Sequence, residues 1–379
     1  MKRKAALDVR TWIEIDRRSL FFNLQQFQAR ARPAKIMAVI KSNAYGHGLS
    51  LVAKLLASHW SLATGHLSLW FGVDSIVEAL RLRRDGIKNP ILVLGYTLPL
   101  RFRDAARWKI TITVSHFDGL AAIARSSSRP AFHVKFDTGM HRHGFQESEL
   151  VELIEKMKKY NLRPAGAYSH LASAENIIFS KKQMAVFDRC VLALRTAGIT
   201  FELIHLNKTE GIVNFPRRDG LARLGIGLYG YLPEGRKGTL IEKFRKRLRP
   251  VLTWKTVVSE VKQVKRGEYI GYDLTYRFSR DAIIAILPIG YWHGYDRGLS
   301  NVGEVLIHGK RATVRGRVCM DIMMVEVTTI PNVHIGDEAV LIGRQGKEFI
   351  SADELGQKIG SGSYEVLTRI NPLIRRFAE

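Results

Sequence analysis

The stretch IMAVIKSNAYGHG, Ile36 to Gly48, joins an apolar run to a polar turn that contains glycine. The run Ile36–Ile40 has the pattern of a buried strand, and Lys41 follows it directly. In parallel α/β barrels, the chemistry takes place where the strands end. A lysine that is desolvated there has a lowered pKa and can form a Schiff base with a carbonyl compound. The stretch therefore predicts a strand that presents a reactive lysine at its C-terminal end.

The same arrangement repeats along the first part of the chain. Helix-like stretches such as SIVEALRLRRDGI (75–87) and ESELVELIEKMKKY (147–160) separate short apolar runs. Eight such runs are centred near Met37, Phe71, Leu92, Ile112, Val134, Ala167, Ile204 and Ala222. Eight strand–helix units within about 200 residues predict an α/β fold of the (β/α)8 TIM-barrel type.

After Pro250 the sequence changes to short runs rich in β-branched residues, separated by glycine-containing turns. This pattern predicts a mainly-β C-terminal domain with one helix at 352–360. The segment TWIEID (11–16) could add a strand to it. We therefore expect a barrel at residues 10–240 and a β domain at 241–379, with residues 10–16 pairing with the second domain.

Composition narrows the class of protein. The chain has 379 residues, 46% of them hydrophobic, and no apolar run near the roughly 20 residues that span a membrane. The start MKRKAALDVR is basic but leads into no apolar segment, unlike a signal peptide. Two cysteines are too few for a disulfide framework. We expect a soluble, cytoplasmic protein without a metal site.

The net charge of +24 is high, and the densest basic run is RKGTLIEKFRKRLR (236–249). A solvated basic surface explains this charge most simply. Nonspecific attraction to polyanions stays open as an alternative, and salt would weaken such binding steeply. We expect no specific nucleic-acid partner.

Polar residues follow the predicted strands at one edge of the barrel. They are Lys41, Asp137, Ser169, His170, Asn207, Lys208 and the stretch Arg223–Gly227. Barrels commonly hold phosphate after strands seven and eight. Backbone amides of Gly225-Ile226-Gly227 suit an anion, because glycine lets a chain approach closely. This edge is the predicted active site.

The octapeptide KSNAYGHG resembles the pyridoxal-phosphate motif of bacterial alanine racemases. Further blocks resemble that family in order from Trp12 to Arg376, namely WIEIDRRSLFFN, FGVDSIVEALRLRRDGI, VKFDTGMHRHGF, YSHLASAE, ARLGIGLYG, GYDLTY, PIGYWHGY, GRVCMD and SYEVLTRI. The resemblance implies a homodimeric enzyme, a barrel plus a β domain, with pyridoxal 5'-phosphate as cofactor. It would interconvert L- and D-alanine by two-base exchange of the α-proton and supply D-alanine for peptidoglycan.

The resemblance also assigns roles around the cofactor. Lys41 would bind it covalently and act as a base on one face of the substrate. Arg223 would hydrogen-bond the pyridine nitrogen, which stays unprotonated because guanidinium keeps its proton, so the ring is a weaker electron sink. The full set of implied cofactor-binding residues is Lys41, Tyr45, Arg142, His170, Asn207, Lys208, Arg223, Gly225, Ile226 and Tyr364.

The second base implied by the resemblance is Tyr272, supplied by the β domain of the partner subunit. Its pKa, about 10 for a free tyrosine, must be lowered by cations for this work, and His170 with Arg223 would form a relay toward it. The implied substrate-binding residues are Arg142, Met320, Asp321 and Tyr291. Tyr291 and Tyr364 would narrow the entrance and select a small side chain.

Some positions depart from the family. Lys208 stands where serine is usual, and would either add charge for the phosphate or point to solvent. Asp273 replaces a common glycine, and Trp292-His293 replaces a frequent Ala-Asp pair. Lys135 matches a lysine that is often carbamylated and then pairs with Arg142.

Competing interpretations keep the cofactor or drop it. A racemase of serine or another amino acid fits the changes near Trp292. A decarboxylase fits less well, because Arg223 suits it poorly. A non-catalytic cofactor carrier would need neither Tyr272 nor Met320-Asp321, and a polyanion-binding protein is supported only by charge.

Overall fold

The computed structural model describes residues 8–64, 69–216, 220–233 and 237–379. Arg236, the first residue of the basic run, lies outside these ranges. The contacts divide the chain into two compact units. One combines the described residues up to Arg18 with 45–51 and 250–379, and the other comprises 19–44 and 52–249.

The second unit contains a parallel sheet of eight described strands. They are β2 (Lys35–Val39), β3 (Trp70–Val73), β4 (Ile91–Val93), β5 (Ile110–Val114), β6 (Phe132–Lys135), β7 (Gly166–Tyr168), β8 (Leu203–His205) and β9 (Leu221–Leu224). Their order is β8-β7-β6-β5-β4-β3-β2-β9, and contacts between β8 and β9 close the ring. All eight expected runs form strands, and the predicted barrel is confirmed.

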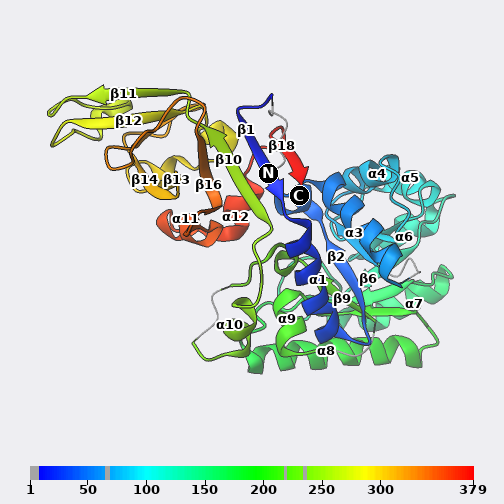
Figure 1. Ribbon diagram of the computed structural model, residues 1–379. Helices are drawn as coiled ribbons and strands as arrows, with labels where there is room; N and C mark the ends of the chain where they lie inside the picture. Colours follow the sequence, from blue (N-terminus) through cyan, green and yellow to red (C-terminus); the bar gives the residue numbers. More distant parts are fainter. Residues whose placement is uncertain (1–7, 65–68, 217–219, 234–236) are drawn as a thin grey trace. The chain divides into compact units, whose positions relative to one another are not determined.

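Helices precede, separate and follow the barrel strands along the chain. They are α1 (Arg17–Ala31), α2 (Lys41–Tyr45), α3 (Leu49–Thr64), α4 (Ile76–Arg84), α5 (Phe102–Arg107), α6 (Phe117–Arg125), α7 (Leu150–Lys159), α8 (Ile177–Thr196), α9 (Thr209–Asn214) and α10 (Leu240–Arg245). Helices α4 to α7 lie outside the strands (Figure 1). In α7 the buried residues Leu150, Leu153 and Met157 share one face, which is the spacing of a helix that covers a sheet.

The other unit is built on an antiparallel sheet. Its strands are β1 (Thr11–Ile15), β10 (Leu252–Val257), β11 (Glu260–Val264), β12 (Ala282–Leu287), β13 (Glu304–Ile307), β14 (Lys310–Val314), β15 (Met323–Glu326), β16 (Glu338–Gln345), β17 (Glu348–Ile350) and β18 (Arg375–Ala378). Strand β1 pairs antiparallel with β10 and parallel with β18, so TWIEID does join this sheet.

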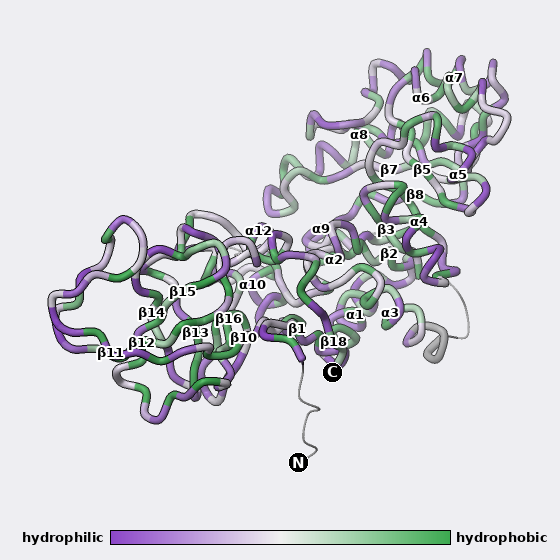
Figure 2. The backbone as a smooth tube through the Cα atoms, turned by 90° about the horizontal axis from the view of Figure 1, so that it is seen from above, coloured by the Kyte–Doolittle hydropathy of each residue, from purple (hydrophilic) through white to green (hydrophobic). Residues whose placement is uncertain are grey.

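The helix expected at 352–360 is α11 (Ala352–Lys358), and a further helix that was not expected, α12 (Ser363–Thr368), follows it. The extra helix begins after a glycine pair around Ser361, which ends α11 early. Strand β16 is mostly hydrophobic in Figure 2 and is buried along its centre, so it belongs to the core of this unit. Strand β11 has both hydrophobic and hydrophilic residues and is largely exposed. Within the described residues, no helix is long and apolar enough to cross a membrane.

Candidate active site

Lys41 begins an unusual turn at the end of β2. Ser42, Asn43, Ala44 and Tyr45 all have φ between 52° and 54°, so α2 is a single left-handed turn without glycine. Each L-residue in this conformation costs about 1–2 kcal/mol. Such strain persists only where surrounding contacts impose it, and it gathers at functional sites.

Glu78 supplies contacts that hold this turn. Its Oε1 accepts a hydrogen bond from the Ser42 amide at 2.6 Å, and its Oε2 accepts from the amides of Asp74 at 2.7 Å and Ser75 at 3.3 Å. Ser75 caps α4 and forms a capping box with Glu78. The same carboxylate therefore fixes the backbone beside Lys41 and beside Asp74. The Asp74 carboxylate in turn lies 3.3 Å from Lys41 Nζ.

Arg223 lies inside the barrel, within β9 rather than after it as the sequence suggested, and is 3% exposed. Its Nη1 donates to Nδ1 of His205 at 2.5 Å and to the His205 carbonyl at 2.9 Å. Its Nη2 donates to the carbonyls of Ser169 at 2.6 Å and Leu206 at 2.9 Å, and lies 3.2 Å from Nδ1 of His170. Burial lowers the pKa of Arg223 to about 10, so it stays charged at neutral pH.

Hydrogen bonds determine which ring nitrogen carries the proton in the histidines around Arg223. Arg223 can only donate, so Nδ1 of His205 accepts and the proton of the neutral ring is on Nε2. That Nε2 lies 2.8 Å from Nδ1 of His133, which therefore accepts and carries its own proton on Nε2. Burial first, and Arg223 second, lowers the pKa of His133 to about 3 and that of His205 well below its usual value. Tyr168 stacks on His205 with ring centroids 4.6 Å apart.

Further cations face the same end of the barrel. Burial, followed by the charges of Arg142 and Arg223, lowers the pKa of Lys135 to about 8. The pKa of His170 falls well below its usual value, mainly through burial and then through Arg223 and Lys208. Lys135, Arg142, Ser169 and His170 line one small pocket. The structure thus brings together a positively charged set of side chains that keeps its histidine neutral.

The residues expected around a phosphate are also in this unit. Asn207 donates to the Phe215 carbonyl at 2.6 Å, while its Oδ1 is buried with no hydrogen-bond partner in the described chain. Lys208 Nζ lies 3.4 Å from the buried Glu210 carboxylate, an ion pair that neither expectation for Lys208 included. The Gly225 amide already donates to Thr209 Oγ1 at 3.0 Å.

The absence of a side chain at Gly227 also has a packing role. A Cβ on Gly227 would lie 2.5 Å from Phe27 Cζ and from Thr209 Cγ2, so its missing side chain serves packing against α1. Ile226 begins the short helix η3 (Ile226–Tyr229) and is buried.

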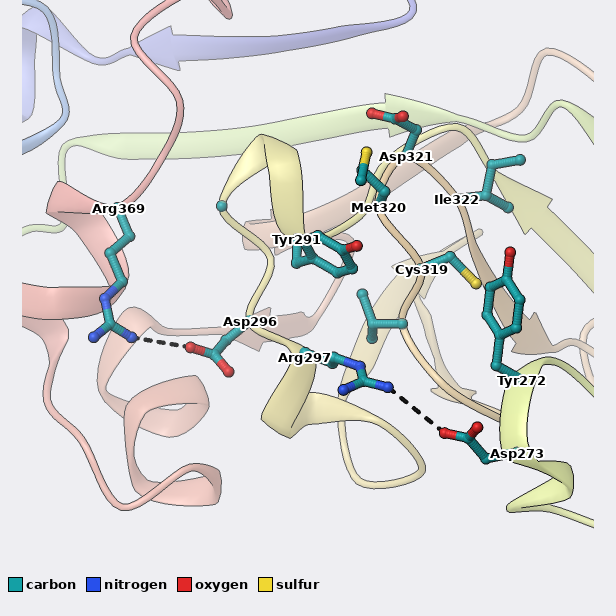
Figure 3. A pocket seen from close by; sticks show the side chains of 12 residues that line it. Tyr272, Asp273, Tyr291, Asp296, Arg297, Cys319, Met320, Asp321, Ile322 and Arg369 are labelled. Atoms are coloured by element: carbon teal, nitrogen blue, oxygen red, sulfur yellow. Dashed lines mark hydrogen bonds and ion pairs between the residues drawn. The ribbon is translucent and has the colours of Figure 1, made fainter.

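In the other unit, an open pocket of about 1140 Å³ collects the remaining substrate residues. Figure 3 shows Tyr272, Tyr291, Met320 and Asp321 around it, with Arg297 beside Asp273. The PIGY and VCMD motifs meet here: the amide of Tyr291 donates to the Cys319 carbonyl at 3.0 Å. A Cβ on Gly290 would lie 2.1 Å from that carbonyl oxygen, which is why glycine is required.

Two further predicted residues meet in the same unit. The rings of Tyr45 and Tyr364 have centroids 6.2 Å apart, although the two residues are 319 positions apart in the sequence. Among the residues that the structure describes, no group of three or more His, Cys, Asp or Glu side chains is placed to hold a metal ion.

Several residues of the site were missed by the sequence analysis. Asp74 and Glu78 lie in the block FGVDSIVEALRLRRDGI, in which no residue was given a role, although the Ser75-x-x-Glu78 spacing is visible as a capping box. His133, Tyr168 and His205 fall inside strands, where they read as ordinary core positions. Only the direction of their side chains into the barrel reveals them.

The chain has the fold of a closed (β/α)8 barrel followed by a β unit. A lysine on a strained turn and an arginine inside the barrel give it a cationic site. Residues 15–233 match the family model for the alanine racemase N-terminal domain, and residues 251–378 match the model for the alanine racemase C-terminal domain. The chain belongs to the alanine racemase family.

Individual relatives agree with this membership. The alanine racemase of Carboxydothermus hydrogenoformans is 38% identical over 372 residues, covering 96% of this chain and 98% of that protein. The solved alanine racemase of Clostridium difficile 630 has a TM-score of 0.89 at 33% identity, covering 98% of this chain and 97% of that one. The Bacillus anthracis alanine racemase with bound L-Ala-P has a TM-score of 0.89 at 33% identity, covering 99% and 96%.

Proposed function

We propose that this protein is a pyridoxal-phosphate-dependent alanine racemase that interconverts L- and D-alanine and supplies D-alanine for peptidoglycan. The observation that carries the proposal is Lys41 on its left-handed turn, held by Glu78 and facing Asp74 at 3.3 Å. Family membership over nearly the full chain supports the same reaction. The relatives named above are alanine racemases, so a serine racemase is not favoured.

The barrel residues fit the cofactor. Pyridoxal phosphate carries a phosphate, a phenolic oxygen and a ring nitrogen, all of which accept hydrogen bonds. The site offers Lys135, Arg142, Lys208 and Arg223 as cationic donors. Burial, and then repulsion by Arg142 and Arg223, lowers the pKa of Lys135. An anionic ligand would relieve this repulsion. When bound, the cofactor withdraws electrons from the substrate's α-carbon and makes its proton acidic.

The chain's own residues would divide the remaining work. Lys41 would attach the cofactor and exchange the α-proton on one face. Arg223 would donate to the pyridine nitrogen, and its hydrogen bonds to Ser169, His205 and Leu206 fix its orientation inside the barrel. Because a guanidinium stays protonated at neutral pH, that nitrogen would remain unprotonated, which favours short-lived carbanions and suppresses side reactions such as transamination.

The second proton exchange would belong to Tyr272. It stands 69% exposed in the wall of the β unit's pocket, and we propose that it serves the barrel of a second copy of the chain. Met320, Asp321 and Tyr291, which line the same pocket, would contact the substrate and limit its side chain to a small group. Arg142 would bind the substrate carboxylate from the barrel side.

A chiral assay tests the proposed function. Purified protein with pyridoxal phosphate should convert L-alanine to D-alanine and should act much more slowly on L-serine. Lys41→Ala should abolish the conversion, whereas Lys54→Ala, which changes an exposed lysine on α3, should not. Racemisation that persists in Lys41→Ala would overturn the assigned role of Lys41.

A further inference from the structure

The turn that carries Tyr272 has an unusual backbone. It is the short helix η4 (Tyr272–Leu274), preceded by Gly271 with φ 73°. Asp273 has φ 61° and Leu274 has φ 48°, a region that residues with a Cβ rarely adopt. Tyr272 and Leu274 are 69% and 64% exposed, so burial of their side chains does not impose this shape.

Hydrogen bonds fix the base of the turn but not its tip. Asn301 Nδ2 donates to Thr275 Oγ1 at 3.3 Å, and Asn301 Oδ1 accepts from the Gly316 amide at 2.7 Å. These contacts hold the residue that follows the turn. Tyr272 lies nearer the tip of the turn than these contacts do.

Asp273 provides a contact nearer the tip. Its Oδ2 lies 3.6 Å from Arg297 Nη2 and 3.3 Å from Arg317 Nε, and Figure 3 shows the pair with Arg297. Arg297 comes from the short helix η6 (Arg297–Leu299) and Arg317 from the loop before β15, so one carboxylate joins the turn to two other segments. Arg317 Nε is buried and has no hydrogen-bond partner in the described part of the chain, which makes the nearby carboxylate its main compensation.

The charged residues that line the pocket support the role of Asp273 as the partner of these arginines. The pocket is lined by the carboxylates of Asp273, Asp296 and Asp321 and by the guanidinium groups of Arg297 and Arg369, although the whole chain carries +24. Asp296 is already paired with Arg369 at 3.0 Å. Asp273 is therefore the carboxylate that balances Arg297 and Arg317 at this wall.

We propose that Asp273 is a positioning residue for Tyr272: its two ion pairs hold the strained turn so that the tyrosine hydroxyl stands where the second proton exchange requires it. This inference rests on the proposed function. A glycine at this position would adopt the same φ without strain, but it would make no contact with Arg297 or Arg317. The carboxylate therefore acts through its charge.

The test compares Asp273→Asn and Asp273→Gly with the wild-type protein and with Tyr272→Phe, all loaded with pyridoxal phosphate. Asparagine tolerates the left-handed conformation and keeps the shape of the side chain but not its charge. Each alanine enantiomer is incubated in deuterium oxide, and inversion is measured separately from α-deuterium gained without inversion. Asp281→Asn is the matched control, because its carboxylate is 64% exposed, pairs with Lys265 at 3.1 Å and lines no part of the pocket.

We expect both Asp273 variants to lose at least about tenfold in inversion, because small displacements of a reacting group have large effects on rate. For one enantiomer, deuterium uptake without inversion should persist, since Lys41 is untouched; Tyr272→Phe should give the same pattern. Inversion at the wild-type rate in Asp273→Asn would overturn the proposal. So would an equal loss of inversion and of uptake for both enantiomers, which indicates general damage.

A second measurement needs no cofactor. Hydrogen exchange of the amides in 271–276 should be faster in Asp273→Asn than in the wild-type protein and unchanged in Asp281→Asn. Unchanged exchange in Asp273→Asn would overturn the role of the ion pairs. If the wild-type protein made no D-alanine at all, the proposed function would fail first, a result distinct from an active wild type with unaffected Asp273 variants.

Discussion

The carboxylate of Glu78 accepts a hydrogen bond from the backbone amide of Ser42 at 2.6 Å. This contact joins the residue after Lys41 to the first turn of α4, two segments that follow neighbouring strands of the barrel. The left-handed turn from Ser42 to Tyr45 is costly by itself. Glu78 therefore stabilises the conformation that places the lysine.

Glu78→Gln should impair this support. A glutamine side chain has one oxygen, so its amide group would face either the Ser42 amide or the Asp74 amide, donor against donor. We expect a loss of about 1–3 kcal/mol in the free energy of unfolding, measured with urea, because one amide loses its acceptor. Racemisation should fall at least about tenfold.

Glu155→Gln, on the exposed face of α7, serves as the control and should change neither quantity appreciably. If Glu78→Gln behaved like this control, the turn would be held by other contacts.

The buried histidines His133 and His205 predict a pH dependence of stability. Their pKa values are lowered in the folded protein, mainly by burial, so the unfolded chain binds more protons just below its own histidine pKa. Stability is thus fully present above about pH 6.5 and is lost as the pH falls from there toward the folded pKa. Between about pH 7 and pH 5, His133, whose folded pKa is about 3, should cost about 2 kcal/mol.

Urea unfolding of the cofactor-free protein at the two pH values measures this loss. His133→Asn removes one of the buried histidines and should reduce the pH dependence by about that amount. A variant that kept the wild-type pH dependence would show that His133 is not held neutral.

The ion pair of Lys208 and Glu210 predicts a coupling between the two residues. Lys208→Ser leaves the buried Glu210 carboxylate without this cation and should destabilise the protein by about 1–3 kcal/mol, whereas Lys208→Ser with Glu210→Gln should recover most of the loss. A double-mutant cycle by urea unfolding measures the coupling. The exposed pair Lys156–Glu152 on α7 is the control, with about 0.3–0.5 kcal/mol expected. A coupling energy between Lys208 and Glu210 no larger than that of the control pair would contradict this ion pair. Lys208 would then either bind the phosphate or point to solvent.

Lys135 should react with carbon dioxide. Carbamylation requires a neutral amine, and a pKa of about 8 leaves roughly a tenth of the amine neutral at about pH 7, far more than for an ordinary lysine. Intact-protein mass spectrometry in bicarbonate should show one added carbon dioxide near pH 8, lost on acidification and absent from Lys135→Arg. The same added mass in Lys135→Arg would assign the modification to another amine.

Much of this architecture could be predicted from the sequence, because barrel strands buried on both faces read as short apolar runs. All eight runs form strands, and TWIEID joins the second sheet as expected. The strands Glu348–Ile350 and Arg375–Ala378 were missed, since they are short and the latter begins with two arginines.

The site residues that lie in sequence motifs could be predicted, whereas the contacts that form only in the folded chain could not. Lys41 follows its strand as expected, but the left-handed turn after it has no glycine signal until Gly46. The pairing of His205 with Arg223 depends on side-chain direction inside a closed ring of strands, which a single sequence does not encode in its pattern. The partner of Lys208 was likewise missed, because Glu210 becomes buried only in the folded chain.

The most direct test of the central claim is to incubate the wild-type protein and pyridoxal phosphate with L-alanine in deuterium oxide, and to analyse the product for chirality and α-deuterium. We expect D-alanine that carries deuterium at the α-carbon, and neither product nor label with Lys41→Ala. Failure of the wild-type protein to form D-alanine, with the cofactor bound, would contradict the proposed function.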